Sequence, residues 1–181
     1  MTIRKILIAP DKQLKKQSLP VANVNAKIHS LIDDMFETMY ASDGLGLAAI
    51  QIGEPKRIIV VDIHNINETV KPICLVNPEI IETSEEAIIH EEGCLSLPEQ
   101  FAAVERPNWV KIRYLNRYGE NKEIEANGVL AVCLQHEMDH LDGILLIDHL
   151  TTLKRRMILR KLNKGKRIEG SKFGQPSSAH N

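Results

Sequence analysis

Residues 127–141 read N-G-V-L-A-V-C-L-Q-H-E-M-D-H-L, and the rest of the fold is best understood from this segment. Asn127 is of a residue type that is preferred at the N-cap of a helix. Gly143 stands just past Leu141, and glycine commonly follows the C-terminus of a helix. The sequence therefore predicts a helix that Asn127 caps and that continues through Leu141.

Two histidines and a glutamate stand inside this predicted helix. His136 and His140 are four residues apart and so face the same side, where two imidazoles can bind one metal ion. Glu137 lies about 100° around the helix, where it can act as a general base on the attacking water. The alternative is an exposed helix with no metal, but the apolar neighbours Val132 and Leu134 favour the metal site.

A catalytic metal site needs a third protein ligand. Cys133 and His140 are seven residues apart, which separates their Cα atoms by about 10.5 Å along a helix axis. Because a cysteine and a histidine on one ion barely cover that distance, we expect Cys133 to pack beside the site. Cys94 is the better candidate, since Gly93 permits a tight backbone and Pro98 ends the extended run. A buried structural cysteine is the alternative for Cys94.

A segment rich in small residues, G-L-G-L-A-A-I-Q, covers residues 44–51. A phosphate-binding loop is a weak interpretation, because no Lys-Ser/Thr pair follows and no strand precedes it. Close approach of a substrate or of another segment to the backbone explains the glycines better. Gln51 could then donate its amide to a developing oxyanion, and a surface glutamine is the alternative.

The remaining patterns indicate the fold class. Apolar residues at helical spacing predict a helix over 25–40, which residues 42–44 end. β-Branched residues predict a buried strand over 57–63, and 117–120 fits a hairpin turn. Further strands are expected over 72–76, 86–90, 110–116 and 122–126, and a third helix over 153–163. Strands mixed with few helices predict an α+β fold with mainly antiparallel sheet.

The chain has 181 residues, enough for one domain with a sizeable core, and 43% of them are hydrophobic. No apolar run approaches the roughly 20 residues that span a bilayer, and the first ten residues do not resemble a secretory signal. The three cysteines argue against a disulfide framework and for a reducing compartment. We therefore expect a cytoplasmic protein that does not contact a membrane.

The charge is unevenly distributed along the chain. Nine lysines or arginines and one acidic residue lie from Thr151 onward, a charge of +8, so residues 1–150 carry −9. A basic end on an acidic body suggests an anionic partner such as a ribonucleoprotein surface, and a solvated helix face is the alternative. Because the last residues are polar and contain glycine, proline and serines, we expect a disordered tail over 169–181.

Three segments taken together resemble the motifs of the peptide deformylase family, in the same order. They are the segment 44–51, E-G-C-L-S at 92–96 and H-E-M-D-H at 136–140. The resemblance implies an α+β fold in which antiparallel β-sheets pack around a central helix that carries the H-E-x-x-H motif. An N-terminal and a C-terminal helix complete that fold, and the catalytic domain covers 1–168.

The resemblance also implies the chemistry. Cys94, His136 and His140 bind one divalent metal ion, natively Fe²⁺, which Zn²⁺, Ni²⁺ or Co²⁺ can replace. Glu137 deprotonates the attacking water, which releases formate from an N-formylmethionyl peptide. Gln51 and the backbone N–H of Leu95 hold the oxyanion.

Further residues take supporting roles by the same resemblance. Leu45, Gly46, Val132 and Cys133 are expected to bind the substrate. Glu92 and Arg106 are expected to steady His136. Phe101 departs from the pattern, because many bacterial relatives have arginine there, so selection beyond the first substrate residue is expected to differ. The expected partners are N-formylmethionyl nascent peptides and the ribosome near the peptide exit, through the basic C-terminal helix of a monomer.

Two rival functions stay open at this stage. A zinc endopeptidase shares the H-E-x-x-H motif, but usually takes a downstream glutamate or histidine as its third ligand. A non-catalytic module with a structural metal would have no use for Glu137. Release of formate from a formylated peptide would distinguish a deformylase from an endopeptidase. The effect of replacing Glu137 on activity would distinguish an enzyme from a non-catalytic module.

Overall fold

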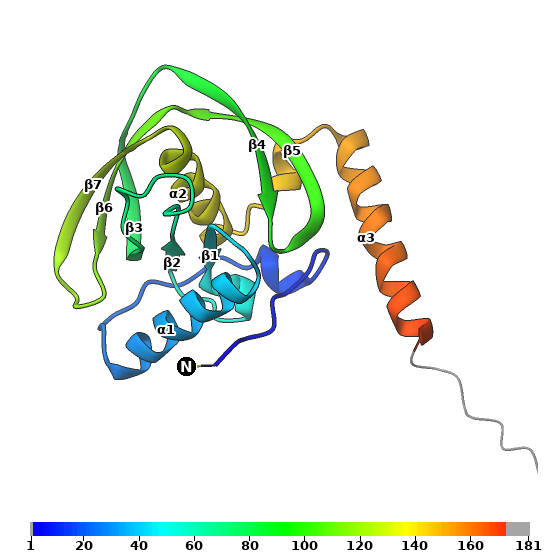
Figure 1. The fold of residues 1–181 in the computed structure, drawn as a ribbon, viewed down its shortest axis with the longest axis horizontal. Helices are drawn as coiled ribbons and strands as arrows, with labels where there is room; N and C mark the ends of the chain where they lie inside the picture. The colour runs from blue at the N-terminus through cyan, green and yellow to red at the C-terminus, as the bar shows by residue number, and fades with distance from the viewer. Residues whose placement is uncertain (1, 173–181) are drawn as a thin grey trace, which may run out of the picture.

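A computed structural model describes residues 2–172 of the chain (Figure 1). The predicted decisive helix is α2 (Gly128–Leu141), with Asn127 at its N-cap position and Asp142 at its C-cap. The Asn127 side chain makes no capping hydrogen bond, so the start of α2 was predicted correctly but the capping contact was not. Gly143 follows with φ of 73°, the left-handed conformation that ends helices.

Seven strands form two antiparallel sheets. The larger sheet has the order β1-β2-β3-β6-β7, and the smaller is the β4–β5 ribbon. The strands are β1 (Gly46–Ala48), β2 (Ile58–Val61), β3 (Ile73–Thr83), β4 (Ala87–Cys94), β5 (Leu97–Pro107), β6 (Trp109–Leu115) and β7 (Asn121–Asn127). Gly119, with φ of 79°, lies in the predicted hairpin turn between β6 and β7.

Helix α2 lies in the middle of the molecule, with the larger sheet on one side and the β4–β5 ribbon on the other (Figure 1). Its apolar face packs on that sheet through a core that includes Ala131, Leu134 and Leu141, all fully buried. The fold is thus α+β with antiparallel sheets around the helix that carries the H-E-x-x-H motif, which confirms the predicted class.

The N-terminal helix, α1 (Ala26–Ala41), covers the edge of the larger sheet at β1 and β2. Asn25 caps it, because its side-chain oxygen accepts hydrogen bonds from the backbone of Lys27 and Ile28. This helix matches the predicted range of 25–40. Short 3₁₀ turns lie at η1 (Lys12–Lys15), η2 (Ala49–Ile52) and η3 (Leu146–His149).

The C-terminal helix, α3 (Thr152–Lys172), stands at the edge of the molecule beside the β4–β5 ribbon (Figure 1). It is longer than the predicted 153–163 and includes the first residues of the segment 169–181 that was predicted as a disordered tail. The rest of that segment lies outside the described residues. No helix in the range 2–172 is long and apolar enough to cross a membrane.

Two strands were predicted too short, and two strands, β1 and β5, were not predicted. Strand β3 continues past 76 to Thr83, because Asn77 adopts a φ of 51° at a bulge and the pairing with β6 resumes beyond it. Strand β4 continues past 90 to Cys94. Strand β5 was not predicted, since it contains two prolines and few β-branched residues, and it forms through its long pairing with β4.

Candidate active site

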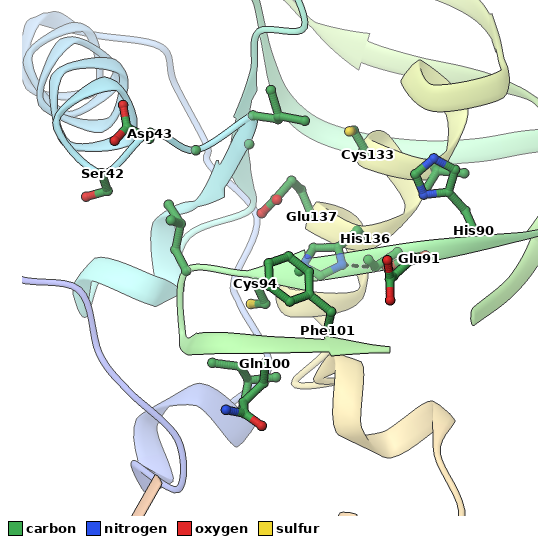
Figure 2. Close-up of a pocket in the computed structure, with 18 of the residues that line it drawn as sticks. Ser42, Asp43, His90, Glu91, Cys94, Gln100, Phe101, Cys133, His136 and Glu137 are labelled. Atoms are coloured by element: carbon green, nitrogen blue, oxygen red, sulfur yellow. Dashed lines mark hydrogen bonds and ion pairs between the residues drawn. The ribbon is translucent and has the colours of Figure 1, made fainter. Parts of the chain in front are cut away.

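A cleft of about 550 Å³ lies between α2, the β4–β5 ribbon and the loop after α1 (Figure 2). Its lining includes both apolar residues and the motif residues Cys94, His136 and Glu137. Gln51 and His140 do not line the cleft, but each of them contacts the sulfur of Cys94, which does. The cleft therefore gathers side chains from all three sequence motifs.

Three ligand-type atoms converge at the base of this cleft. The side chains of Cys94, His136 and His140 each offer one atom, and these atoms lie within 4.8 Å of one another. Cys94 Sγ is 3.3 Å from His140 Nε2. The pairing of β4 with β5 shifts register between Gly93 and Cys94, and Cys94 at this end of β4 contacts His140 on α2. Cys133 is not part of the cluster, as the helix geometry predicted.

This set of donors fits a divalent transition metal. Thiolate and imidazole both bind divalent transition metals, and a site with three protein ligands keeps a fourth position open for water or substrate. His136 Nδ1 donates to Glu92 over 2.8 Å, which leaves its Nε2 for a metal. His140 Nδ1 is buried and has no hydrogen-bond partner among residues 2–172.

The pKa values of the two histidines shift in opposite directions. Burial lowers the pKa of His136, but hydrogen bonds to Cys94 and Glu92 outweigh it and raise that pKa well above the ordinary value. Burial lowers the pKa of His140, and the charge of His136 lowers it further. His140 is therefore held neutral, the form in which imidazole binds metal.

Glu92 and Arg106 form a buried ion pair behind His136. Arg106 Nη2 donates to Glu92 Oε2 over 2.9 Å, and each residue is 5% exposed. Burial by itself would raise the pKa of Glu92, but hydrogen bonds from His136 and Arg106 lower it to about 2. The predicted pair is thus in place to orient the His136 ring.

Glu137 is buried and points into the cleft (Figure 2). Burial raises the pKa of its carboxyl to about 7, although the charge of His136 lowers it. Within the part of the chain that the structure describes, Glu137 Oε2 has no hydrogen-bond partner. Gly46 lies against it, because a Cβ at this position would be 2.5 Å from Glu137 Oε1. A buried carboxyl with a pKa near neutrality suits a general acid and base.

Gln51 is fixed at both ends of its amide. Its Oε1 accepts from the backbone N–H of Ala48 over 2.8 Å, and its Nε2 donates to Ser96 Oγ over 3.1 Å. The same Nε2 lies 3.7 Å from Cys94 Sγ. Gln51 is 1% exposed, so it is not the surface glutamine of the alternative interpretation.

The predicted substrate-binding residues line one wall of the cleft. They are Leu45, Gly46, Val132 and Cys133. Burial raises the pKa of Cys133 to about 12, so its thiol stays protonated and behaves as a small apolar group. Leu95 also lines the cleft and packs against Gly44, where a Cβ would be 2.6 Å from Leu95 Cδ1.

Sequence reasoning missed several residues around the site. Ser96 is fully buried and orients Gln51, and its place in the second motif was the available signal. Asp139 Oδ2 accepts from Arg106 over 2.9 Å and lies 2.8 Å from His149 Nε2. His90 lines the cleft, and its Nδ1 is buried with no hydrogen-bond partner among the described residues. Nothing in the local sequence of His90 or His149 distinguishes them from ordinary packing or surface histidines, so the sequence assigns them no role in the site.

The chain is similar to known proteins over most of its length. The family model described as polypeptide deformylase matches residues 3–156. A peptide deformylase from Phenylobacterium zucineum is 54% identical over 91% of this chain and 97% of its own. One from Rhizobium meliloti is 47% identical over 95% of this chain and 99% of its own.

Solved structures show the same likeness. A peptide deformylase from Ehrlichia chaffeensis has a TM-score of 0.89 and 40% identity, over 93% of this chain and 99% of that one. The Ehrlichia chaffeensis protein in complex with actinonin has a TM-score of 0.89 and 42% identity, over 92% and 99%. From the family match and the extent of these likenesses, we conclude that this chain belongs to the polypeptide deformylase family, whose enzymes remove the N-formyl group from nascent peptides.

Proposed function

We propose that the cleft is where this chain hydrolyses the formyl amide of N-formylmethionyl peptides, with Cys94, His136 and His140 holding one divalent metal ion. Fe²⁺ is the expected native metal, and Zn²⁺, Ni²⁺ or Co²⁺ can replace it. When bound, the metal supplies a Lewis acid that activates water and polarises the formyl carbonyl. The convergence of the three ligand atoms within 4.8 Å is the observation that carries this proposal.

Glu137 is the group that moves the proton. Its buried carboxylate accepts a proton from the attacking water as the oxygen bonds to the formyl carbon. The same carboxyl then returns the proton to the nitrogen of methionine as the C–N bond breaks. Formate and a free N-terminus leave the site. A carboxyl pKa of about 7 supports both steps, because either protonation state is accessible near neutrality.

Gln51 and the backbone N–H of Leu95 stabilise the oxyanion. The Ala48 backbone and the Ser96 hydroxyl hold the Gln51 amide in one orientation, with Nε2 toward Cys94. A donor that is already oriented needs no reorganisation when charge develops on the formyl oxygen. Ser96 is therefore a positioning residue for Gln51.

The apolar wall next to Glu137 binds the methionine side chain. Leu45, Val132 and Cys133 contribute the apolar surface. Because Gly46 has no side chain, its own backbone can lie against Glu137. The protonated Cys133 thiol suits a neighbouring thioether, because both are soft apolar groups. The deepest part of the cleft therefore binds methionine, the first residue of the substrate.

Formate release tests the function directly. Protein loaded with iron under anaerobic conditions should release formate from formyl-Met-Ala-Ala-amide, and it should not cleave an unblocked peptide internally. Glu137→Ala should lower kcat by about 10³-fold or more while metal content stays at one ion per chain. Internal cleavage without formate would support the endopeptidase rival, and full activity of the variant would contradict the role of Glu137.

The setting of the reaction is also a proposal. We place the protein in the cytoplasm, as a monomer that meets formylated chains at the ribosome near the peptide exit. α3 supports this, because it is rich in lysine and arginine and exposes Leu153 and Met157 to solvent. Co-sedimentation with ribosomes should fall when Arg156 and Arg160 are replaced by glutamate. Unchanged co-sedimentation would contradict this role of α3.

A further inference from the structure

Residues 2–10 run along the protein without forming a helix or a strand, and we call them the N-terminal strap. Figure 1 shows the strap, in dark blue, leaving the N-terminus beside α1 and running to η1. The strap belongs to none of the three sequence motifs. Its backbone nevertheless hydrogen-bonds to residues of two of those motifs, which gives it a part in the construction of the site.

Two backbone N–H groups of the strap make these bonds. The N–H of Leu7 donates to the carbonyl oxygen of Gln51 over 2.7 Å, and the N–H of Ala9 donates to the carbonyl oxygen of Ser96 over 3.0 Å. Leu7 and Ala9 are two residues apart in the chain, and two residues span at most about 7 Å. Residues 7–9 are therefore a short spacer between the backbones of Gln51 and Ser96.

The spacer connects the two donors that the proposed function assigns to the oxyanion. One donor is Nε2 of Gln51, and the other is the backbone N–H of Leu95, the residue before Ser96. A direct contact joins the same two segments a second time, because Gln51 Nε2 donates to Ser96 Oγ over 3.1 Å. The three hydrogen bonds and residues 7–9 form a closed cycle, so a change in the spacing of the donors must break or stretch one of these bonds.

This cycle lies in the protein interior. Ala9 and Ser96 are fully buried, and Gln51 is almost so. Leu7 packs against the core cluster that contains Ala9 and Leu97. Hydrogen bonds are stronger away from water, and a buried carbonyl that loses its donor has no water to replace it. The burial therefore favours one fixed arrangement of the cycle.

The other end of the strap is bonded to α1. The N–H of Thr2 donates to Asp34 Oδ1 over 2.7 Å, and Arg4 Nε donates to Asp34 Oδ2 over 2.9 Å. The N–H of Arg4 donates to Thr38 Oγ1 over 2.9 Å. Burial by itself would raise the pKa of Asp34, but the hydrogen bonds from Arg4 and Thr2 lower it, so this anchor is an ionised carboxylate near neutral pH. The strap is thus held at both ends.

We propose that the N-terminal strap sets the separation of the two oxyanion donors, through the N–H groups of Leu7 and Ala9. The inference rests on the proposed function, because it concerns the oxyanion of formyl hydrolysis. Leu7 and Ala9 are positioning residues that act through Gln51 and Ser96, and neither of them lines the cleft. Spacing matters because such donors lower the barrier only when they meet the charge where it develops.

The test removes one N–H and keeps the side chain. Replacing Leu7 by its α-hydroxy acid puts an ester oxygen in place of the N–H and deletes the bond to Gln51. With formyl-Met-Ala-Ala-amide we expect kcat to fall about tenfold while KM changes by less than about twofold. Metal content and the Ki of the product Met-Ala-Ala-amide should not change, because the product carries no formyl oxygen. An unchanged kcat would overturn the inference.

Leu19 provides the matched control. Its N–H donates to the carbonyl oxygen of Pro55 over 2.9 Å, and neither residue lines the cleft. The same α-hydroxy acid at Leu19 deletes a backbone bond of the same kind, and kcat should stay within about twofold of the unmodified protein. Urea unfolding of both ester proteins checks that their losses of stability are similar. A fall in kcat as large at Leu19 as at Leu7 would overturn the inference.

Ala9 tests the other end of the spacer. Its ester deletes the bond to Ser96 and should lower kcat by a factor similar to that of the Leu7 ester. This ester also weakens the Ile8 carbonyl, which accepts from the N–H of Asp11, so an ester at Asp11 is its control and should leave kcat unchanged. Because both spacer bonds belong to one cycle, the double ester should lose little more than either single ester. Effects that multiply would overturn the spacer.

The same assay separates this inference from the function beneath it. If the unmodified, iron-loaded protein releases no formate, both fall. If it releases formate and the Leu7 and Ala9 esters are as fast, the role of the strap falls and the deformylase activity stands. A fall in kcat confined to these two esters, with KM and the product Ki constant, supports both.

Discussion

The inner wall of the cleft and its mouth both hold carboxylates, but in opposite circumstances. At the inner wall Glu92 is buried against Arg106. It accepts a hydrogen bond from His136, which fixes the orientation of the His136 ring. At the mouth Glu91, the preceding residue on β4, is exposed and has no partner among the described residues. Alternation along a strand sends the two side chains to opposite faces. One face of β4 therefore maintains the site, and the other is free to meet the substrate.

The largest effect is expected from breaking the buried pair. Arg106→Ala leaves the Glu92 carboxylate buried without its cation, and such changes cost about 3–5 kcal/mol. Urea unfolding of the metal-free protein measures the loss. Arg113→Ala is the control, since Arg113 meets Glu123 at 3.7 Å in an exposed pair, and it should cost less than about 1 kcal/mol. Equal losses would show that burial does not govern these pairs.

Two glycines give a second contrast between the inner wall and the mouth. Gly46→Ala places a Cβ 2.5 Å from Glu137 Oε1, and the buried carboxylate must shift. A displacement of this kind at a catalytic group costs about 10²-fold in rate. We expect kcat for formate release to fall by about that factor with metal content unchanged.

Gly93→Ala is the partner experiment at the mouth. The three atoms nearest to its Cβ all belong to the Phe101 ring, which is exposed and can move into solvent. This change should raise KM while kcat changes by less than about threefold, because no group at the reacting atoms is displaced. A larger fall in kcat for Gly93→Ala than for Gly46→Ala would contradict the assignment of these two glycines.

A contrast between local and long-range contacts explains which parts of the site the sequence could predict. The spacing of His136 and His140 and the exclusion of Cys133 follow from helix geometry, because local periodicity carries that information. For Cys94 the local residues left a metal ligand and a buried structural cysteine open, and only the resemblance favoured the ligand. Cys94 meets the helix through the pairing of β4 with β5, which includes a register shift next to Cys94 that no local pattern encodes. Long-range pairing decided this part of the site.

The fold shows the same limit. Helix α1 and strand β2 were predicted because their apolar periodicity is local. Strand β5 was missed because its prolines and charged residues disfavour a strand, and only its pairing with β4 forms it. The roles of Asp139 and His149 were hidden for a similar reason, because η3 meets α2 only after the chain has turned at Gly143.

Acid should weaken the buried pair in a defined range. The pKa of Glu92 falls from 4.5 to about 2 on folding, so its contribution to stability is fully present above pH 4.5. That contribution is lost as the pH falls from 4.5 toward 2. The difference in unfolding free energy between the metal-free protein and Glu92→Gln should therefore shrink by about 2 kcal/mol across this range. A difference that stays constant with pH would contradict the assignment.

The smallest effect is expected where the chain of charges reaches solvent. Asp139 Oδ2 accepts a hydrogen bond from the buried Arg106. The same oxygen contacts His149, whose side chain is 30% exposed. Solvent screens this outer contact, so His149→Asn should cost less than about 1 kcal/mol of stability. Double-mutant cycles for Glu92–Arg106, Arg106–Asp139 and Asp139–His149 should give coupling energies that decrease in that order. An outermost coupling as large as the innermost would mean that the pairing pattern, and not burial, sets the strength of each link.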